Sequence, residues 1–238
     1  MAVAFDAVQP GSSGKSGTSS PQTWTHTVST GPAAIVVGIA VGHAVGSDTQ
    51  TLTVTCDGTG MSLLGSVVND NQGSSSAGKT YLYGIASQSA AGHSMSVGVS
   101  GGPTLDSIVT GSVSYSGADT SSPFGTAVTN FGSSGAPAVT VTGTTSGNMV
   151  AGVASIGSDT LTNPSTSRWI KNLNNNSSAG NAGQADHAAG GSITLTWSGD
   201  SPDWWGTVGV EVLAASSATF IAAQPLAVAQ AVKRAAYY

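Results

Sequence analysis

Charged side chains are scarce in this chain of 238 residues. Asp, Glu, Lys and Arg together make up 7% of the sequence, against roughly 25% in ordinary soluble domains. The net charge is −5, and the only adjacent basic pair is Lys233–Arg234, so nucleic-acid binding is not expected. Hydrophobic residues, at 39%, are too frequent for a disordered chain. The surface must therefore consist mainly of hydroxyl, amide and backbone groups, which suits a protein packed against neighbours or persisting outside cells.

Cysteine and long apolar runs are also rare. The single cysteine, Cys56, excludes a disulfide framework within the chain. It alternates in phase with Leu52 and Val54, which favours a buried, inert thiol over a reactive one. The first residues lack the basic and apolar regions of a signal peptide, and no stretch has the length of a transmembrane helix. We therefore expect no membrane insertion and no standard secretion.

Period-two alternation of apolar with small or polar residues is the dominant pattern of the chain, and it is typical of strands. The predicted strands are 3–7, 24–28, 35–41, 52–56, 81–85, 95–99, 109–115, 139–141, 149–153, 193–197 and 208–212. Clusters of Gly, Ser, Asn, Asp and Pro separate them, as turns require. Because parallel strands need long crossovers, short strands without intervening helices favour antiparallel pairing. We expect an all-β chain, folded as an antiparallel β-sandwich of jelly-roll or lectin-like type.

Two stretches interrupt the alternation. Residues 9–22 are rich in Gly and Ser, and residues 165–191 are rich in Asn, Ala and Gly. Both are interpreted as loops, and loops of this length are either functional or surface insertions without a role. We assign residues 1–215 to one sandwich domain and residues 216–238 to a C-terminal docking arm.

The second half of the arm, residues 225–238, predicts a short helix. Apolar residues recur along one stripe, and the cations lie near the C-terminal end, where the helix dipole favours them. A helix this short is marginally stable by itself. It should dock on its own sandwich or on a neighbouring subunit, and we favour the neighbour. The candidate docking residues are Leu226, Ala229, Val232, Tyr237 and Tyr238.

One segment matches the phosphate-binding loop pattern G-x-x-x-x-G-K-[ST] letter for letter, from Gly73 to Thr80. That loop acts through the N-terminal amides of a following helix. Here the residues from Tyr81 onward alternate as a strand, so the dipole would be missing. We interpret the match as chance in a chain rich in Gly and Ser, and we expect no nucleotide or other cofactor.

Catalytic and metal-binding patterns are weak. His26, His43, His93 and His187 lie far apart without metal spacing, and only the last has a carboxylate beside it, at Asp186. Structural or solvated roles are favoured for all four histidines. The segment 69–73 offers too few carboxylates for a calcium loop. The sequence therefore predicts no catalytic, cofactor or metal site, and no enzyme.

Trp204 and Trp205 form the most prominent aromatic pair. By alternation one should point inward and the other outward. An outward tryptophan could stack on a sugar or anchor a partner protein. The alternative, which we favour, is that both are buried at the start of the last strand.

Several segments resemble a β-sandwich domain of tailed-phage virion proteins. They are Val3-Ala-Phe-Asp-Ala followed by a Gly/Ser-rich loop, Trp24-Thr-His-Thr-Val28, the strands 35–41 and 81–85, Val113-Ser-Tyr-Ser-Gly117, and Thr194-Leu-Thr-Trp197 before the final Val-x-Val strand. The ending Ala231-Val-Lys-Arg-Ala-Ala-Tyr-Tyr238 resembles the tails of minor tail proteins from phages of actinobacteria. The resemblance implies a virion structural protein with a lectin-like or jelly-roll sandwich and no catalytic residues.

Two functions follow as expectations. The first is a non-enzymatic minor tail or capsid decoration protein, assembled in the host cytoplasm, located on the phage particle, and bound to itself and to other virion proteins. The second is a carbohydrate-binding module for host adhesion that uses Trp204 or Trp205 and the loop 165–191.

Overall fold

The computed structural model describes residues 1–10, 14–43, 49–69, 77–157, 160–162, 166–173, 179–199 and 204–216. These residues form nineteen strands and no helix. All strand pairs are antiparallel, which confirms the predicted all-β sandwich class. The candidate docking residues Leu226, Ala229, Val232, Tyr237 and Tyr238 lie outside the described residues, as does the helix predicted there.

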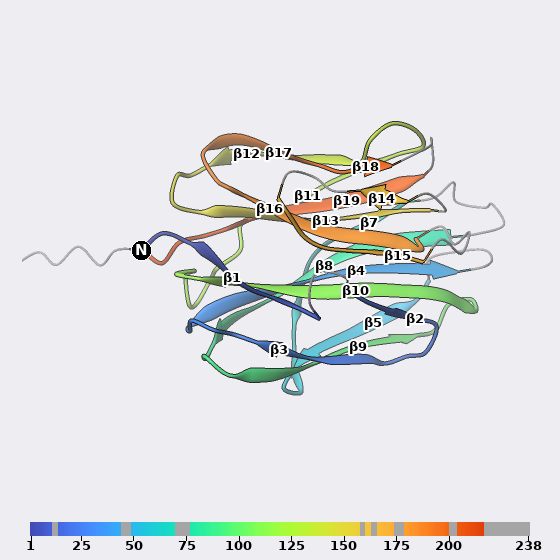
Figure 1. Ribbon diagram of the computed structural model, residues 1–238, viewed down its shortest axis with the longest axis horizontal. Helices are drawn as coiled ribbons and strands as arrows, with labels where there is room; N and C mark the ends of the chain where they lie inside the picture. Colours follow the sequence, from blue (N-terminus) through green and yellow to red (C-terminus); the bar gives the residue numbers. More distant parts are fainter. Residues whose placement is uncertain are drawn as a thin grey trace, which may run out of the picture.

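The strands stack in four layers (Figure 1). The first outer sheet has the order β3-β9-β5-β6, with β3 Gln22–Thr27, β5 Thr51–Cys56, β6 Thr59–Gly60 and β9 Gly92–Ser100. The first inner sheet has the order β1-β10-β4-β8-β7, with β1 Ala4–Gln9, β4 Ala33–His43, β7 Ser62–Val68, β8 Ala77–Gln88 and β10 Leu105–Ser116; β2 Lys15–Gly17 also pairs with β10.

The other two layers come from the second half of the chain. The second inner sheet has the order β11-β19-β13-β16-β15, with β11 Val128–Gly132, β13 Met149–Ile156, β15 Ser167–Asn172, β16 Asn181–Ala188 and β19 Trp205–Val212. The second outer sheet pairs β12 Ala138–Thr144 with β17 Gly191–Thr196, beside the small pair β14 Leu161–Thr162 and β18 Ser198–Gly199.

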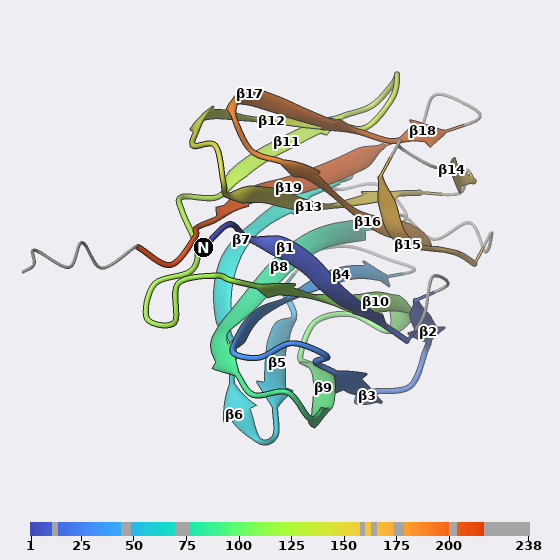
Figure 2. The same ribbon diagram turned by 60° about the vertical axis from the view of Figure 1, so that its left-hand side comes forward.

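The two halves, residues 1–116 and 117–216, have the same strand topology (Figure 2). In chain order, β1, β4, β7, β8 and β10 of the first inner sheet correspond to β11, β13, β15, β16 and β19 of the second. The outer pair β3–β9 corresponds to β12–β17. The letters Ser-Ser-Ala-Gly stand at both 75–78 and 177–180, around the start of β8 and just before β16. The molecule is therefore two similar sandwiches packed back to back through their inner sheets.

Three hydrophobic cores separate the four layers. The core inside the first half places Ile35, Val37 and Ile39 of β4 opposite β5 and β9, and it also contains the rings of Tyr81 and Tyr83. The alternate residues of β4, such as Val36 and Ala40, face the second half. All eleven residues of β4 are consequently buried. The core inside the second half contains large aromatic side chains, including those of Trp197 and Trp205.

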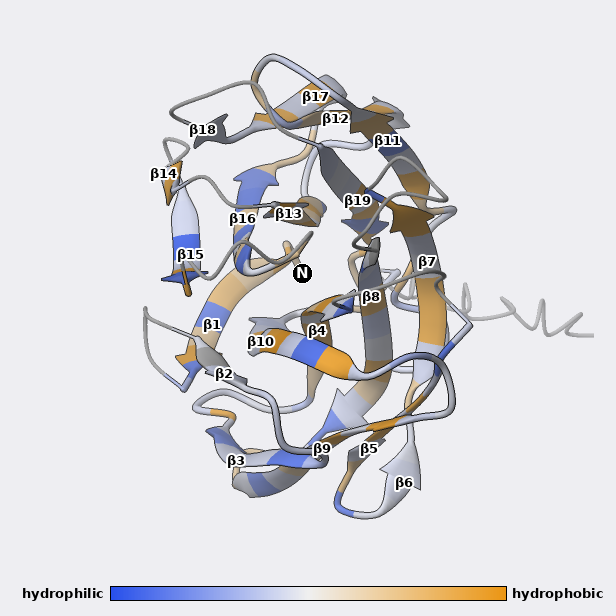
Figure 3. Cartoon of the chain, turned by 90° about the vertical axis from the view of Figure 1, so that its right-hand side faces the viewer, coloured by the Kyte–Doolittle hydropathy of each residue, from blue (hydrophilic) through white to orange (hydrophobic). Residues whose placement is uncertain are grey.

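The segment 165–191, predicted to be a loop, is instead largely regular, so that prediction was wrong. It contains β15 and β16, and β16 lies between β13 and β15 in the second inner sheet. Figure 3 shows why periodicity missed β16: the strand is coloured hydrophilic, yet it lies inside the stack. Its polar residues Asn181, Gln184 and Asp186 are 0% exposed and are held by specific partners rather than by solvent. The other predicted loop, 9–22, contains the short strand β2.

Both ends of the described chain lie at the same end of the stack (Figure 1). The amide of Val3 donates to the carbonyl of Gly147, and that of Ala215 to the carbonyl of Gly117. A pocket of about 280 Å³, with mainly apolar walls, is lined by Met1, Pro32 and Ala215, among others. The segment that follows residue 216 therefore starts beside the N-terminus.

Candidate functional site

The outward faces of the two outer sheets carry hydroxyl groups. On the first outer sheet, β3, β5 and β9 turn outward Thr23, Thr25, Thr27, Thr51, Thr53, Thr55, Ser94, Ser96, Gly98 and Ser100. The pairing register aligns Thr23, Ser96 and Thr55 in one row across the three strands. None of the outward residues on these strands is charged.

The second outer sheet repeats this surface. Its outward residues are Ala138, Thr140, Thr142, Ser192, Thr194 and Thr196. Thr140 and Thr194 lie opposite each other, and their hydroxyl oxygens are 2.9 Å apart. Strand alternation directs every second residue into the core, so the threonines that separate the valines and leucines here form an uncharged hydroxyl face. Flat faces of this kind can hydrogen-bond neutral polar partners.

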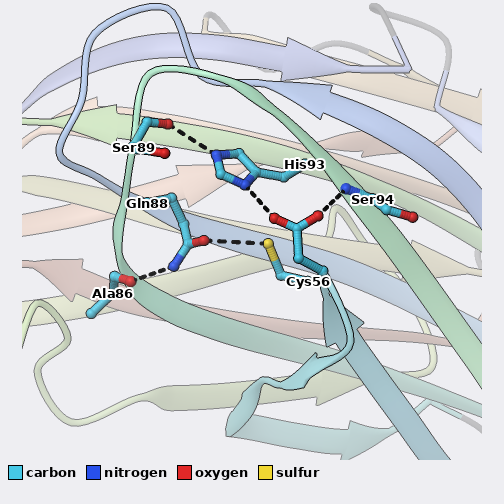
Figure 4. Close-up of polar contacts among 7 residues, drawn as sticks. Cys56, Ala86, Gln88, Ser89, His93 and Ser94 are labelled. Atoms are coloured by element: carbon cyan, nitrogen blue, oxygen red, sulfur yellow. Dashed lines mark hydrogen bonds and ion pairs between the residues drawn. The ribbon is translucent and has the colours of Figure 1, made fainter.

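A compact side-chain cluster lies at one end of the first outer sheet (Figure 4). Cys56 ends β5, Asp57 follows it in the turn to β6, and His93 lies on the neighbouring strand β9. Their ligand-type atoms all lie within 4.8 Å of one another. Cys56 and His93 are 1% and 5% exposed, whereas half of the Asp57 side chain is open to solvent.

Hydrogen bonds fix the orientation of each member of this cluster. His93 Nδ1 lies 2.7 Å from Asp57 Oδ2, and His93 Nε2 lies 2.9 Å from the carbonyl of Ser89. The amide of Ser94 donates to Asp57 Oδ1 over 2.7 Å. The Cys56 thiol donates weakly to Gln88 Oε1, with sulfur and oxygen 3.5 Å apart. The cluster therefore ties the turn after β5 to the turn between β8 and β9.

The electrostatics of the cluster follow from these contacts. Burial, and secondarily the charge of Asp57, raise the pKa of the Cys56 thiol to about 11. The hydrogen bonds from His93 and from the amide of Ser94 lower the pKa of Asp57. Burial acts to lower the pKa of His93, but the bonds to Ser89 and Asp57 outweigh it and raise the pKa overall.

Nucleophilic catalysis by this cluster is disfavoured by the same geometry. A catalytic cysteine needs an adjacent base that takes its proton, and both ring nitrogens of His93 are engaged elsewhere. The raised thiol pKa keeps Cys56 protonated at neutral pH, which agrees with the predicted inert thiol. Cys, His and Asp are, however, all donors to transition metals.

A second polar cluster lies between the two halves. Asp186 is 0% exposed and accepts two hydrogen bonds from the Arg168 guanidinium, each 2.7 Å long. Its Oδ2 also accepts a hydrogen bond from the hydroxyl of Tyr115, 3.0 Å away. Burial raises the pKa of Tyr115 well above its usual value. Arg168 lies over the ring of Phe5, 3.7 Å from its centroid. This cluster joins strands of both inner sheets and has no exposed carboxylate, which indicates a structural role.

The predicted aromatic site is only partly accessible. Trp205 is 6% exposed, packs in the core of the second half, and donates its indole N–H to the carbonyl of Ser134. Trp204 is half-buried, and its carbonyl accepts a hydrogen bond from the amide of Gly157. Trp205 thus has no face free for a sugar, and Trp204 retains partial exposure.

The phosphate-loop match does not acquire the geometry of that loop. Ala77 to Thr80 begin the long strand β8, so no helix follows the Gly-Lys-Thr triplet. Thr80 is buried, with its hydroxyl beside that of Ser155 in the other half. Residues 73–76 lie outside the described part of the chain.

The other three histidines lie either in the interior or at the surface. His26 and His43 are 0% exposed, and His187 is exposed. Asp186 and His187 are neighbours in sequence, but they point to opposite faces of β16, and only Asp186 is buried. The proximity of His93 to Cys56 and Asp57 was not foreseen, because it depends on the pairing of β5 with β9. The only local signal was the Asp57–Gly58 turn.

Comparison with known proteins gives no match: neither a protein family, nor a curated protein, nor a solved structure is similar to this chain. Among the described residues, no helix has the length and apolar character needed to cross a membrane.

Proposed function

We propose that this protein is a non-enzymatic structural subunit of a phage particle, of the minor tail or capsid decoration type. The observation that carries the proposal is the pair of uncharged hydroxyl faces on opposite sides of the stack, with Thr25 and Thr53 on one and Thr140 and Thr194 on the other. Charged residues are depleted at the centres of protein interfaces. Faces without charge can approach copies of themselves or neutral neighbours with little electrostatic repulsion. The resemblance to virion proteins supports the same assignment.

The placement of the chain ends supports attachment through the termini. Val3 and Ala215 are both held at one end of the stack, and the arm after residue 216 starts there. We therefore propose that the arm makes the permanent contact with the particle or with a second copy.

The arm can be tested by comparing the full chain with residues 1–216 in light scattering. The cut must fall after residue 216, because the amides of Ala214 and Ala215 bond to Asn148 and Gly117 within the fold. We expect an oligomer for the full chain and a monomer for the shortened one. A monomer in both cases would contradict self-association through the arm.

Carbohydrate binding is the second candidate, and the partial exposure of Trp204 favours it. An exposed part of an indole ring can stack on a sugar. A glycan array probed with the wild type and with Trp204→Ala tests this function. Saturable binding that the substitution removes would favour adhesion, whereas no binding would leave the structural role. Trp205→Ala is unsuitable as a probe, because it removes a core side chain.

A further inference from the structure

The cluster of Cys56, Asp57 and His93 has the composition of a metal site. It offers one sulfur, one imidazole nitrogen and one carboxylate oxygen within 4.8 Å of one another. All three come from one end of the first outer sheet, where the pairing of β5 with β9 sets their positions (Figure 4). This placement is independent of the proposed structural function.

The surroundings of the cluster orient the donor atoms as in metal sites. A ligating histidine usually donates its other ring N–H to a backbone carbonyl or carboxylate, which fixes the tautomer. His93 Nε2 lies 2.9 Å from the Ser89 carbonyl, so Nδ1 is directed toward the cluster. The Ser94 amide holds Oδ1 of Asp57, so that Oδ2, which now contacts His93 Nδ1, also faces the cluster. Two backbone groups therefore support two of the three ligands.

We propose that Cys56 Sγ, His93 Nδ1 and Asp57 Oδ2 bind one divalent transition-metal ion, with Zn²⁺ as the expected ion. Zinc accepts mixed sulfur, nitrogen and oxygen ligands at about 2.0 to 2.3 Å, which places tetrahedral ligands roughly 3.3 to 3.6 Å apart. Side-chain rotations must widen the 2.7 Å contact between His93 and Asp57 and shorten the longest separation among the three donor atoms, which is up to 4.8 Å. Because half of the Asp57 side chain is exposed, water can take the fourth position.

The exchange of protons for the ion is balanced. The ion replaces the thiol proton of Cys56 and the proton held between Nδ1 of His93 and Oδ2 of Asp57, and both protons pass to solvent. The weak hydrogen bond from the thiol to Gln88 Oε1 is lost with the thiol proton, while Gln88 Nε2 keeps its bond to the carbonyl of Ala86. The bound ion would crosslink the turn after β5 to the turn between β8 and β9.

Cobalt is the direct probe, because thiolate ligation gives it a charge-transfer absorption. The full chain is stripped with a chelator and titrated with Co²⁺, and the cobalt is then displaced with Zn²⁺. We expect one equivalent of Co²⁺, a thiolate charge-transfer band, and loss of the band on addition of zinc. Zinc should also raise the Tm of the full chain, and a chelator should reverse the rise.

Matched variants assign the ligands. Cys56→Ala should abolish the charge-transfer band and weaken binding by about 100-fold or more, and His93→Gln and Asp57→Asn should weaken it by at least about 10-fold. His187→Gln, which removes an exposed histidine remote from the cluster, should bind as the wild type does. The metal-free Tm of each variant reports folding. If His93→Gln unfolds, Cys56→Ala decides the question, because alanine fits in the space of the thiol. Failure of the wild type to bind, or binding unchanged in Cys56→Ala, would overturn the proposal.

Discussion

The two halves of the molecule share a topology but differ in what fills them. The first half encloses a core beneath a four-stranded outer sheet, in which the aliphatic residues Ile35, Val37 and Ile39 are joined by Tyr81 and Tyr83. The second half has a two-stranded outer sheet, and the aromatic residues buried in its core are the tryptophans Trp197 and Trp205.

The two inner sheets also differ in how many polar side chains each contributes to the interface between the halves. The second inner sheet supplies Arg168, Gln184 and Asp186, whereas the first supplies mainly apolar residues with Tyr115 and Thr80 as partners. A sheet buried on both faces has no solvent to satisfy polar groups, so their hydrogen bonds must come from within the protein. Gln184 Oε1 accepts such a bond from Trp169, whereas Gln184 Nε2 is buried without one. The same strand order can therefore bury an inner face that is mainly apolar or one that carries several polar side chains.

The largest expected effect comes from the buried carboxylate at this interface. Asp186→Ala leaves the Arg168 guanidinium and the Tyr115 hydroxyl without their acceptor. Removing one partner of a buried ion pair costs about 3 to 5 kcal/mol. Urea unfolding should show this loss of unfolding free energy, and the matched change Asp106→Asn, at a half-buried carboxylate of β10, should cost far less. Equal losses at the two positions would mean that the halves do not depend on this pair.

Histidine burial in the first half predicts a pH dependence. His26 is fully buried, and its Nδ1 lies 2.8 Å from the Ser112 hydroxyl. Burial lowers the pKa of His26 to about 4. The charge of Asp6 acts to raise this pKa, and the charge of His93 acts to lower it. Between pH 6.5 and pH 4, this histidine is protonated in the unfolded chain but not in the folded chain. The free energy of unfolding therefore falls as the pH drops from 6.5 toward 4. The full effect is up to about 3 kcal/mol.

The pH effect is measured as a difference between two proteins in chelator-containing buffer. Unfolding free energies of the wild type and His26→Gln are compared between neutral pH and pH 4. The wild type should lose more stability than the variant over this range. Parallel curves would show that His26 titrates normally in the folded state.

Close packing between the halves gives the third prediction. A Cβ at Gly111 would lie 2.6 Å from the indole of Trp169, so Gly111→Ala must displace a buried ring. Overpacking of this kind costs about 1 to 3 kcal/mol. At Gly98, on the outer face of β9, the nearest atom would be 3.6 Å away, and Gly98→Ala should be neutral or slightly stabilising. Thermal unfolding of the two variants tests this difference. Similar Tm values would contradict a tight contact between Gly111 and the Trp169 ring.

The smallest effect on stability is expected at the outer faces. Thr53→Lys and Thr194→Lys place a charge on one face each and should change the unfolding free energy by less than about 0.5 kcal/mol. If a face packs against a second copy, the lysine should weaken self-association in light scattering. The variant with the larger effect identifies which half supplies that contact. If neither lysine changes self-association, neither outer face packs against a second copy, and self-association would depend on the arm alone.

The strands with clear alternation were predictable, because their apolar residues face one core and their small or polar residues face solvent or close neighbours. Residues 52–56 and 193–197 are examples, and both lie in or next to outer-sheet strands. The inert thiol of Cys56 and the packed ring of His26 were predictable from the same periodicity. β16 was not, since its Asn, Gln and Asp side chains are buried against partners elsewhere in the fold, although Nε2 of Gln184 has no hydrogen-bond partner.

The amino-acid sequence by itself determined the all-β class, the low charge of the surface and the positions of most turns, because these depend on local periodicity and composition. Only the tertiary structure decided that four layers form, that the two halves repeat one topology, and that His93 meets Cys56 and Asp57. Strand alternation specifies which side of a strand is buried, but it carries no information about which strand lies beside it. Pairing between strands far apart in the chain brings the side-chain clusters together, and that pairing is decided by the packing of the whole molecule.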